Sequence, residues 1–156
     1  MMECLNLDIG LKSYQLVEGG TPLVFNPGDQ NVYARYMEAM DEIKAVETEM
    51  SAKANAVIAA DDSEAEKERT GAESLRIMRE TDSRMKSILN KVFGVGNDFD
   101  KILCGVNLMA LTSDNNRVIN KVLEALSPIM QDGARACAET EVVQAKLNRA
   151  QRRANQ

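Results

Sequence analysis

The chain contains no glycine or proline between Asp29 and Ala60, and the apolar residues of this stretch recur at helical spacing. An uninterrupted run with apolar side chains three, four or seven positions apart predicts one long amphipathic helix. Such a helix, about 30 residues and about 45 Å long, needs a second long element to cover its apolar stripe. The expected stripe consists of Tyr33, Tyr36, Met40, Ile43, Met50, Ala54 and Val57.

A second long helix is predicted to follow and to pack against the first. Asp61-Asp62-Ser63 interrupts the first stripe and is suited to cap the new helix, with Glu64 and Glu66 in its first turn. Further along, an alternation of three and four residues forms a heptad face with a single polar member. This face consists of Leu75, Met78, Asp82, Met85, Leu89 and Val92. Residues 29–93 are therefore expected to form a long antiparallel helical hairpin.

Residues 1–28 are expected to form a short β segment. Three β-prone runs lie within Glu3–Phe25, and Gly10 and Glu18-Gly19-Gly20 mark the turns between them. A meander of three short strands needs packing from other elements to persist, so it should rest on the helices. After it, Asn26-Pro27-Gly28-Asp29 should open the first helix, with either its first or its last residue as the cap.

The rest of the chain, residues 94–148, is expected to form a pair of helices. The two glycines of Gly94-Val95-Gly96-Asn97 favour the end of the second helix. A short helix capped by Asn97 or Asp98 should follow. Its expected inner face consists of Phe99, Ile102, Leu103 and Val106.

A last long helix is expected after Ser113 or Asp114, either of which can cap it. Pro128 lies inside this helix and is expected to kink it. Beyond Gly133 the apolar face thins, and residues 149–156 are expected to fray as a basic tail. The expected stripe is Val118, Ile119, Val122, Leu123, Leu126 and Ile129. The predicted fold class is therefore α+β and mainly α, in one domain.

The residue types on which most catalytic and metal sites depend are missing or scattered. The chain contains no histidine, which excludes serine and cysteine triads and removes the commonest metal ligand. Cys4, Cys104 and Cys137 have no zinc-ligand spacing and are expected to be buried structural residues. Phe93–Asp98 contains G-x-G but lacks the further glycine or lysine of a nucleotide-binding loop. We therefore expect no catalytic residue, no cofactor and no metal, and a protein that is not an enzyme.

The net charge of −5 and the sequence pI near 4.9 disfavour nucleic acid and anionic membranes as partners. The odd number of cysteines favours a reducing cytosol over a secreted disulfide framework, and no signal-peptide pattern is present. Between Lys146 and Gln156 the chain carries four cations and no acid, a local charge of +4. These cations either balance the negative end of a helix dipole or dock an acidic partner.

The long Met- and Ala-rich stripes leave two interpretations open. Either all of them form the core of this chain or of a homo-oligomer, or part of the Met40–Met50 or Met78–Met85 surface receives apolar helices of a client protein. The two interpretations overlap, because a helical hairpin has too few layers to bury every stripe internally. The candidate partner-binding residues are Tyr36, Met40, Ile43, Met50, Met78 and Met85, together with Arg149, Arg152 and Arg153 of the tail.

Two short motifs carry a resemblance to a known family. They are Phe25-Asn26-Pro27-Gly28-Asp29, between the β segment and the first helix, and Val92-Phe93-Gly94-Val95-Gly96, at the end of the second helix. In this order and spacing the chain resembles the small tail assembly chaperones of long-tailed phages and prophages of Gram-positive bacteria. Family members often carry an acidic residue after the first glycine of the second motif, where this chain has Val95, so a charge-dependent role of that turn does not carry over.

The resemblance implies a non-enzymatic function, with no catalytic residue to carry over. Proteins of this family bind the long, aggregation-prone tape measure protein and keep it soluble before the tail tube polymerises around it. They act in the host cell cytoplasm and are absent from the finished virion. The implied partner is thus a tape measure protein, with self-association as a further possibility.

Two other functions stay open from the residues alone. A structural virion protein, such as a head–tail connector or tube subunit, could use its N-terminal strands to extend a neighbour's sheet. An inhibitor or regulator of a host protein or nucleic-acid machine could instead act through the acidic surface.

Overall fold

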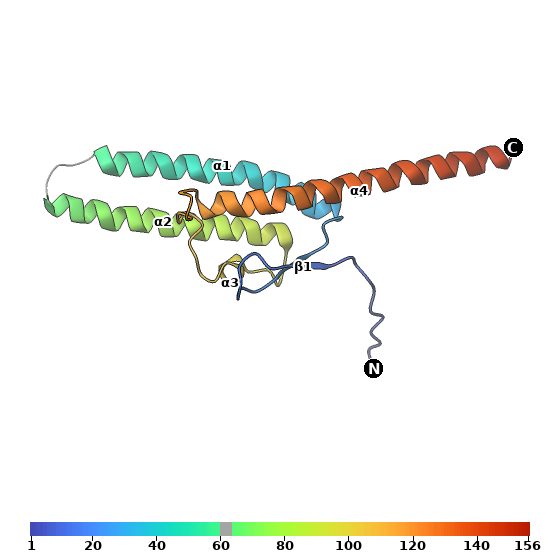
Figure 1. Cartoon of the computed structure of the whole chain (residues 1–156), viewed down its shortest axis with the longest axis horizontal. Coiled ribbons are helices and arrows are strands. Elements are labelled where there is room, and N and C mark those ends of the chain that lie inside the picture. Colours follow the sequence, from blue (N-terminus) through green and yellow to red (C-terminus); the bar gives the residue numbers. More distant parts are fainter. Residues whose placement is uncertain (60–63) are drawn as a thin grey trace.

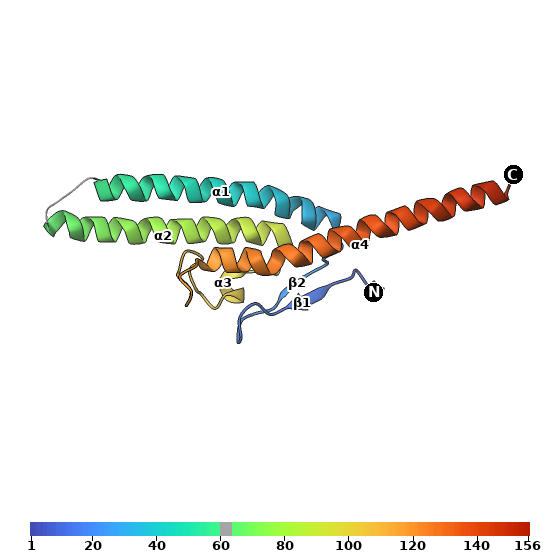
Figure 2. The same ribbon diagram turned by 45° about the horizontal axis from the view of Figure 1, so that its top comes forward.

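The computed structural model describes residues 1–59 and 64–156, and in these it contains one small sheet and four helices. The elements are β1 (Lys12–Tyr14), β2 (Leu23–Phe25), α1 (Gln30–Ala59), α2 (Glu64–Phe93), α3 (Phe99–Ile102) and α4 (Val118–Ala154). Helices α1 and α2 lie side by side as a long hairpin, and α4 starts beside them and continues well past their end (Figures 1 and 2). The expected fold class and the helical hairpin are confirmed. The cap expected at Asp61-Asp62-Ser63 lies outside the described residues.

The buried stripe of α1 differs from the predicted one, because it includes Val32, Ala39 and Val46. Its buried members are Val32, Tyr36, Ala39, Ile43, Val46 and Met50, which alternate by four and three residues. Tyr33 and Met40 lie at the edge of this seam and are only half-buried. The alternation averages 3.5 residues, the period that keeps one face of a helix against a neighbouring helix along its whole length.

The buried face of α2 also differs from the predicted one at its start. Ile77 is buried, whereas Leu75, the first residue of the predicted face, is exposed. Further along, Met85, Leu89 and Val92 are buried as expected. The prediction for Leu75 was wrong because the face of α2 that meets α1 passes through Ile77.

A buried charged cluster joins α2 to the segment that follows it. The Lys86 ammonium lies 3.0 Å from Asp82 Oδ2 and 2.8 Å from Asp100 Oδ1, and Asp82 Oδ1 accepts a hydrogen bond from the Leu108 backbone N–H at 2.7 Å. Burial alone lowers the pKa of the Lys86 ammonium, but the hydrogen bonds and charges of Asp100 and Asp82 raise it overall. Asp82, the single polar member of the predicted α2 face, thus has two specific partners, the Lys86 ammonium and the Leu108 N–H.

The N-terminal β segment has two strands and not three. Strands β1 and β2 pair antiparallel, with Ser13 opposite Val24. The preceding segment, residues 3–11, forms no strand, so the predicted three-stranded meander was wrong. Within the described residues no element lies beside that segment to complete its backbone hydrogen bonds, and its side chains are exposed.

The start of α1 is capped by the last residue of the Asn26-Pro27-Gly28-Asp29 motif. The Asp29 carboxylate accepts a hydrogen bond from the Asn31 N–H at 2.9 Å, and the helix begins at Gln30. The Asn26 side chain instead accepts from the Gly28 N–H at 2.8 Å and donates to the Ile9 carbonyl at 3.0 Å. Of the two caps that the sequence left open, the structure selects Asp29.

The segment after α2 is less helical than expected. Helix α2 ends at Phe93, and Gly94 and Gly96 have φ angles of 86° and 95°, which favour glycine. Asp98 caps the four-residue α3 by accepting from the Asp100 N–H. Val106 is exposed and does not belong to the inner face predicted for this helix, because α3 ends before reaching it.

Helix α4 begins later and ends later than expected. Neither Ser113 nor Asp114 caps it, because residues 111–117 form a turn in which the Asp114 carboxylate accepts from Lys121 at 2.7 Å. The helix starts at Val118, continues through Pro128 and ends at Ala154. The expected frayed tail of residues 149–156 is therefore helical over most of its length. No helix within residues 1–59 and 64–156 has a span long and apolar enough to cross a membrane.

Candidate partner-binding surfaces

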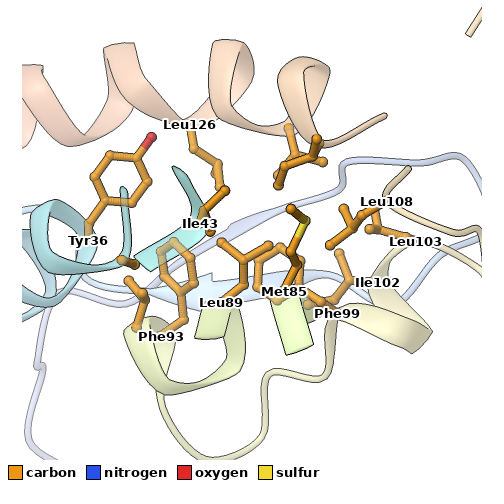
Figure 3. Packing of buried hydrophobic residues seen from close by; sticks show 14 of the residues in the cluster. Tyr36, Ile43, Met85, Leu89, Phe93, Phe99, Ile102, Leu103, Leu108 and Leu126 are labelled. Carbon is orange, nitrogen blue, oxygen red and sulfur yellow. The ribbon is translucent and has the colours of Figure 1, made fainter. Parts of the chain in front are cut away.

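Most of the residues predicted to bind a partner lie inside this chain. Tyr36, Ile43 and Met85 are buried in the contact between α1, α2 and α4, as Figure 3 shows. The Tyr36 hydroxyl lies 2.7 Å from Ser127 Oγ on α4, and burial raises the pKa of its phenol. The other apolar candidates are Met50, which is buried, and Met40 and Met78, which are half-buried. In this conformation these six side chains belong to the core or pack against it.

The three arginines predicted for the tail lie apart from that core. Arg149, Arg152 and Arg153 are exposed on the last turns of α4, which extend away from the rest of the molecule (Figure 1). The structure therefore does not combine the tail with the methionine stripes into one site.

The two motifs that carry the family resemblance meet in the structure. Asn97, which follows the second motif, accepts a hydrogen bond from the Val24 N–H at 2.9 Å and donates to the Val24 carbonyl at 2.9 Å. It also donates to the Phe93 carbonyl at 3.0 Å. The rings of Phe25 and Phe93 pack with their centroids 4.7 Å apart. The Asn97 amide thus takes the place of a neighbouring strand at the outer edge of β2 and joins the β hairpin to α2.

Replacing Asn97 by alanine is expected to lower the free energy of unfolding by about 2 kcal/mol, because three buried or half-buried backbone hydrogen bonds lose their partner. Urea denaturation followed by circular dichroism measures the change. Asn120, an exposed asparagine of α4, is the matched control, and its replacement by alanine should change the free energy by less than about 0.5 kcal/mol. Equal effects at the two positions would contradict the role assigned to Asn97.

A first apolar surface begins at this junction and continues along the N-terminal segment. Large side chains at alternate positions of the N-terminal segment point into solvent, with exposed fractions of 79% at Leu5, 79% at Leu7, 61% at Ile9 and 56% at Leu11. Val95, at the tip of the glycine turn, is fully exposed. Between them lies a groove of about 440 Å³ whose lining includes Ile9, Leu11, Phe25, Phe93 and Val95. We call Leu5, Leu7, Ile9, Leu11 and Val95 the arm–turn surface.

A second apolar surface lies on α4 after Gly133. The last hydrogen bonds that the described residues form between this helix and the body run from Gln30 Nε2 to Cys137 Sγ at 3.0 Å and to Glu141 Oε1 at 2.9 Å. Val143 and Leu147, farther along, are both exposed. We call residues 134–154 the α4 extension.

Both surfaces offer apolar contact area. Among the described residues no group of three or more histidine, cysteine, aspartate or glutamate side chains is placed to hold a metal ion. All three cysteines are free; Cys4 and Cys104 are exposed and Cys137 is half-buried, so their expected burial was wrong. The exposed leucines and valines instead offer apolar area, whose removal from water by a partner contributes about 25 cal/mol per Å².

Sequence reasoning missed these surfaces although both leave a signal. The leucines and isoleucine of residues 5–11 alternate strictly, a pattern that predicts a strand although the segment is an exposed arm. The α4 extension continues the heptad spacing of the buried half of α4. Because most residues on that face are small, the sequence shows few large apolar side chains there.

Comparisons of the chain with models of protein families, with curated proteins and with solved structures found no match.

Proposed function

We propose that this protein is a phage tail assembly chaperone, which binds apolar segments of a tape measure protein and keeps that client soluble until the tail is built. The observation that carries this proposal is the arm–turn surface. It presents five large apolar side chains to solvent next to a core that is already complete. Contiguous exposed apolar surface on a small protein is typical of a site that a partner covers.

The form of the arm–turn surface suits an apolar client segment. The arm has no regular secondary structure, and its large side chains stand at every second residue and are all exposed. Its backbone is left-handed at Asn6 (φ 40°) and Gly10 (φ 72°), so these side chains do not lie on one regular strand face. The Asn26 side chain holds the Ile9 carbonyl at 3.0 Å and fixes the base of the arm beside the groove. A client helix or strand could lie between the arm and Val95 and cover both.

The charge of the chain supports a role in solubility. The net charge is −5, and self-repulsion between acidic complexes opposes their aggregation. The function needs no catalytic residue, cofactor or metal, and it involves neither nucleic acid nor membrane. It would be carried out in the host cell cytoplasm, and the protein would be missing from the mature virion.

The family resemblance supports the same surface. Both motifs that carry it, Phe25–Asp29 and Val92–Gly96, lie around the groove between the arm and the glycine turn. The residue that departs from the family pattern, Val95, is apolar and exposed. In this chain it adds apolar area to the surface in place of a charge.

Replacing Leu5, Leu7 and Ile9 together by serine is expected to weaken binding of the tape measure protein from the same genome by about tenfold, which corresponds to about 1.4 kcal/mol. Co-expression followed by measurement of soluble client, and titration of the purified pair, give the two readouts. The same triple variant should unfold at an unchanged urea concentration, because the three side chains make no core contact.

The matched control replaces Ile58, Leu75 and Leu111 by serine. These three residues are exposed to a similar degree and belong to other parts of the fold: Ile58 lies near the end of α1, Leu75 in α2, and Leu111 in the turn before α4. The control should bind the client as the wild-type protein does. Failure of the wild-type protein to raise the solubility of the tape measure protein would overturn the proposed function, and equal loss in the two triple variants would overturn the assignment of the surface.

One observation favours a second candidate function, that of a structural virion protein. The outer edge of β1 has no strand beside it within the described residues, and the arm precedes it, so either could add to the sheet of a neighbour. Mass spectrometry of purified particles distinguishes the two functions. A chaperone should be absent from the particles, whereas a structural subunit should be present in many copies.

A further inference from the structure

Helix α4 carries one uninterrupted heptad seam, of which only the first part is covered. Positions three and four residues apart run from Ile119 to Ala154 without a break. The first members, Ile119, Val122 and Leu126, are buried against the body. The members beyond Gly133 are all exposed: Ala136, Thr140, Val143, Leu147, Ala150 and Ala154. We call these six residues the α4 seam.

The α4 extension lies beside the body only as far as Glu141, and its later turns have no described element beside them. It is about 20 residues and about 30 Å long, and after Glu141 every residue of it is exposed. Isolated helices of this length are marginal in water, and most helices in proteins owe their stability to packing of an apolar face. A regular apolar seam on a projecting helix therefore indicates that something covers it.

We propose that the α4 seams of two copies of this chain pair with each other in antiparallel orientation. The charges on the extension favour this occupant. Glu139 and Glu141 lie on its first turns together with one cation, Arg135, which gives a charge of −1 there. Its last turns carry a charge of +4, from Lys146, Arg149, Arg152 and Arg153. Parallel pairing would align acids with acids and cations with cations, whereas antiparallel pairing brings the acidic half of each helix to the basic half of the other.

The seam is also self-complementary in shape when the two antiparallel helices cross with Ala145 of each copy at the centre of the pair. In that register Val143 lies opposite Leu147 of the partner subunit, Thr140 opposite the partner's Ala150, and Ala136 opposite the partner's Ala154. The large residues meet at the centre, and the small residues toward both ends let the helices approach closely. In this register the partner's Ala150 and the partner's Ala154 lie beside a hollow of about 680 Å³ that Thr140 and Ala136 line together with Gly10, Lys12 and Tyr14 of this body.

The flanking charges predict a weak but specific pair. Glu139 lies beside the partner's Arg153 on each side of the pair, while the two Lys146 side chains face each other near the centre and limit the affinity. A dissociation constant in the micromolar range is expected, because only two large apolar residues of each copy meet in the seam.

Replacing Val143 by aspartate is expected to raise the dissociation constant of the dimer at least about tenfold. Sedimentation equilibrium of the full chain, over about 5 to 500 µM, measures it. Val142 is the matched control: it is 53% exposed against 56% for Val143, but it lies off the seam. Val142→Asp should dimerise as the wild-type chain does, and any loss of helix caused by aspartate itself is common to both variants.

Charge reversal tests the orientation. Glu139→Arg and Arg153→Glu should each weaken the dimer, and the double variant should restore it, since the same two charges face each other across an antiparallel pair. A wild-type chain that stays monomeric across the concentration range overturns the proposal, as do equal effects of the Val142 and Val143 changes. If Val143→Asp instead lowers only client binding, the seam belongs to the client and the proposal fails. The arm variant should still dimerise, so this result is separate from the test of the proposed function.

Discussion

Replacing Gly133 by alanine is expected to lower the free energy of unfolding by about 3 kcal/mol, although alanine is the better helix former. A Cβ atom at this position would lie 1.8 Å from the Pro27 carbonyl oxygen and 2.6 Å from the carbonyl carbon. Both are backbone atoms of the loop that precedes α1, so they cannot move aside as the end of a flexible side chain can. Helix α4 and this loop would have to separate.

The same change at Gly71 is expected to have the opposite sign. Gly71 lies in α2, is exposed, and has no atom within 4 Å of the position of an added Cβ. Alanine there should stabilise the protein by up to about 1 kcal/mol, because it gains helix propensity and meets nothing. Urea denaturation of the two variants measures both changes. A Gly133→Ala protein as stable as the wild type would show that α4 does not approach the loop as closely as described.

Removal of the Asp82 carboxylate is the second change with a large expected effect. In Asp82→Ala the buried Lys86 ammonium keeps only Asp100, which is largely exposed, and the Leu108 N–H loses its acceptor. Breaking one side of a buried ion pair leaves a charge without compensation, and a loss of about 3 kcal/mol is expected. Denaturant unfolding at neutral pH measures the loss.

Two further variants separate charge from hydrogen bonding at this site. Asp82→Asn keeps an oxygen for the Leu108 N–H and should cost about 1 kcal/mol, less than the alanine variant. Glu80→Ala removes a carboxylate from the same helix, but its ion pair with Arg76 is exposed, so the change should stay within about 0.5 kcal/mol. A ranking in which Glu80→Ala costs as much as Asp82→Ala would contradict the structural role of the buried cluster.

The arm–turn surface and the α4 extension lie toward the same end of the molecule. Both chain termini lie away from the end where α1 finishes and α2 begins (Figures 1 and 2). If the proposed functions are correct, a dimer joined through α4 would present two arm–turn surfaces. Two linked sites would hold a long client more firmly than one, because the second contact is made within the same complex.

The sequence predicted the elements well where the signal is local. The spacing of apolar residues gave the long helices, and Gly94 and Asp98 marked the end of α2 and the start of α3 where the structure has them. The same local reasoning failed for residues 3–11. An alternating segment forms a strand only when another strand lies beside it, and the alternation itself does not say whether one does. It failed also for the end of α4, because no local rule separates a helix that frays from one that projects.

The candidate surface could not be predicted in the same way. Tyr36, Ile43 and Met85 have the residue type of a tolerant binding surface, but α4 covers them in the fold. Val143 and Leu147 looked like the end of a weakening stripe, but they are exposed. Whether an apolar side chain belongs to a core or to a surface depends on the element that lies over it, and that element is distant in sequence.

The sequence by itself determined that this chain is built from long helices, that it lacks histidine chemistry, and that its apolar residues exceed what one helical hairpin can cover. These properties follow from composition and from periods of three to four residues, which act between neighbours on one helix. Only the tertiary structure decided which stripe is buried, that Asn97 completes the edge of a strand 73 residues earlier, and that the arm and the α4 extension stay uncovered. Such contacts depend on the packing of whole elements. That packing is stabilised by many weak contacts across the fold, and it cannot be recognised from any single residue of the sequence.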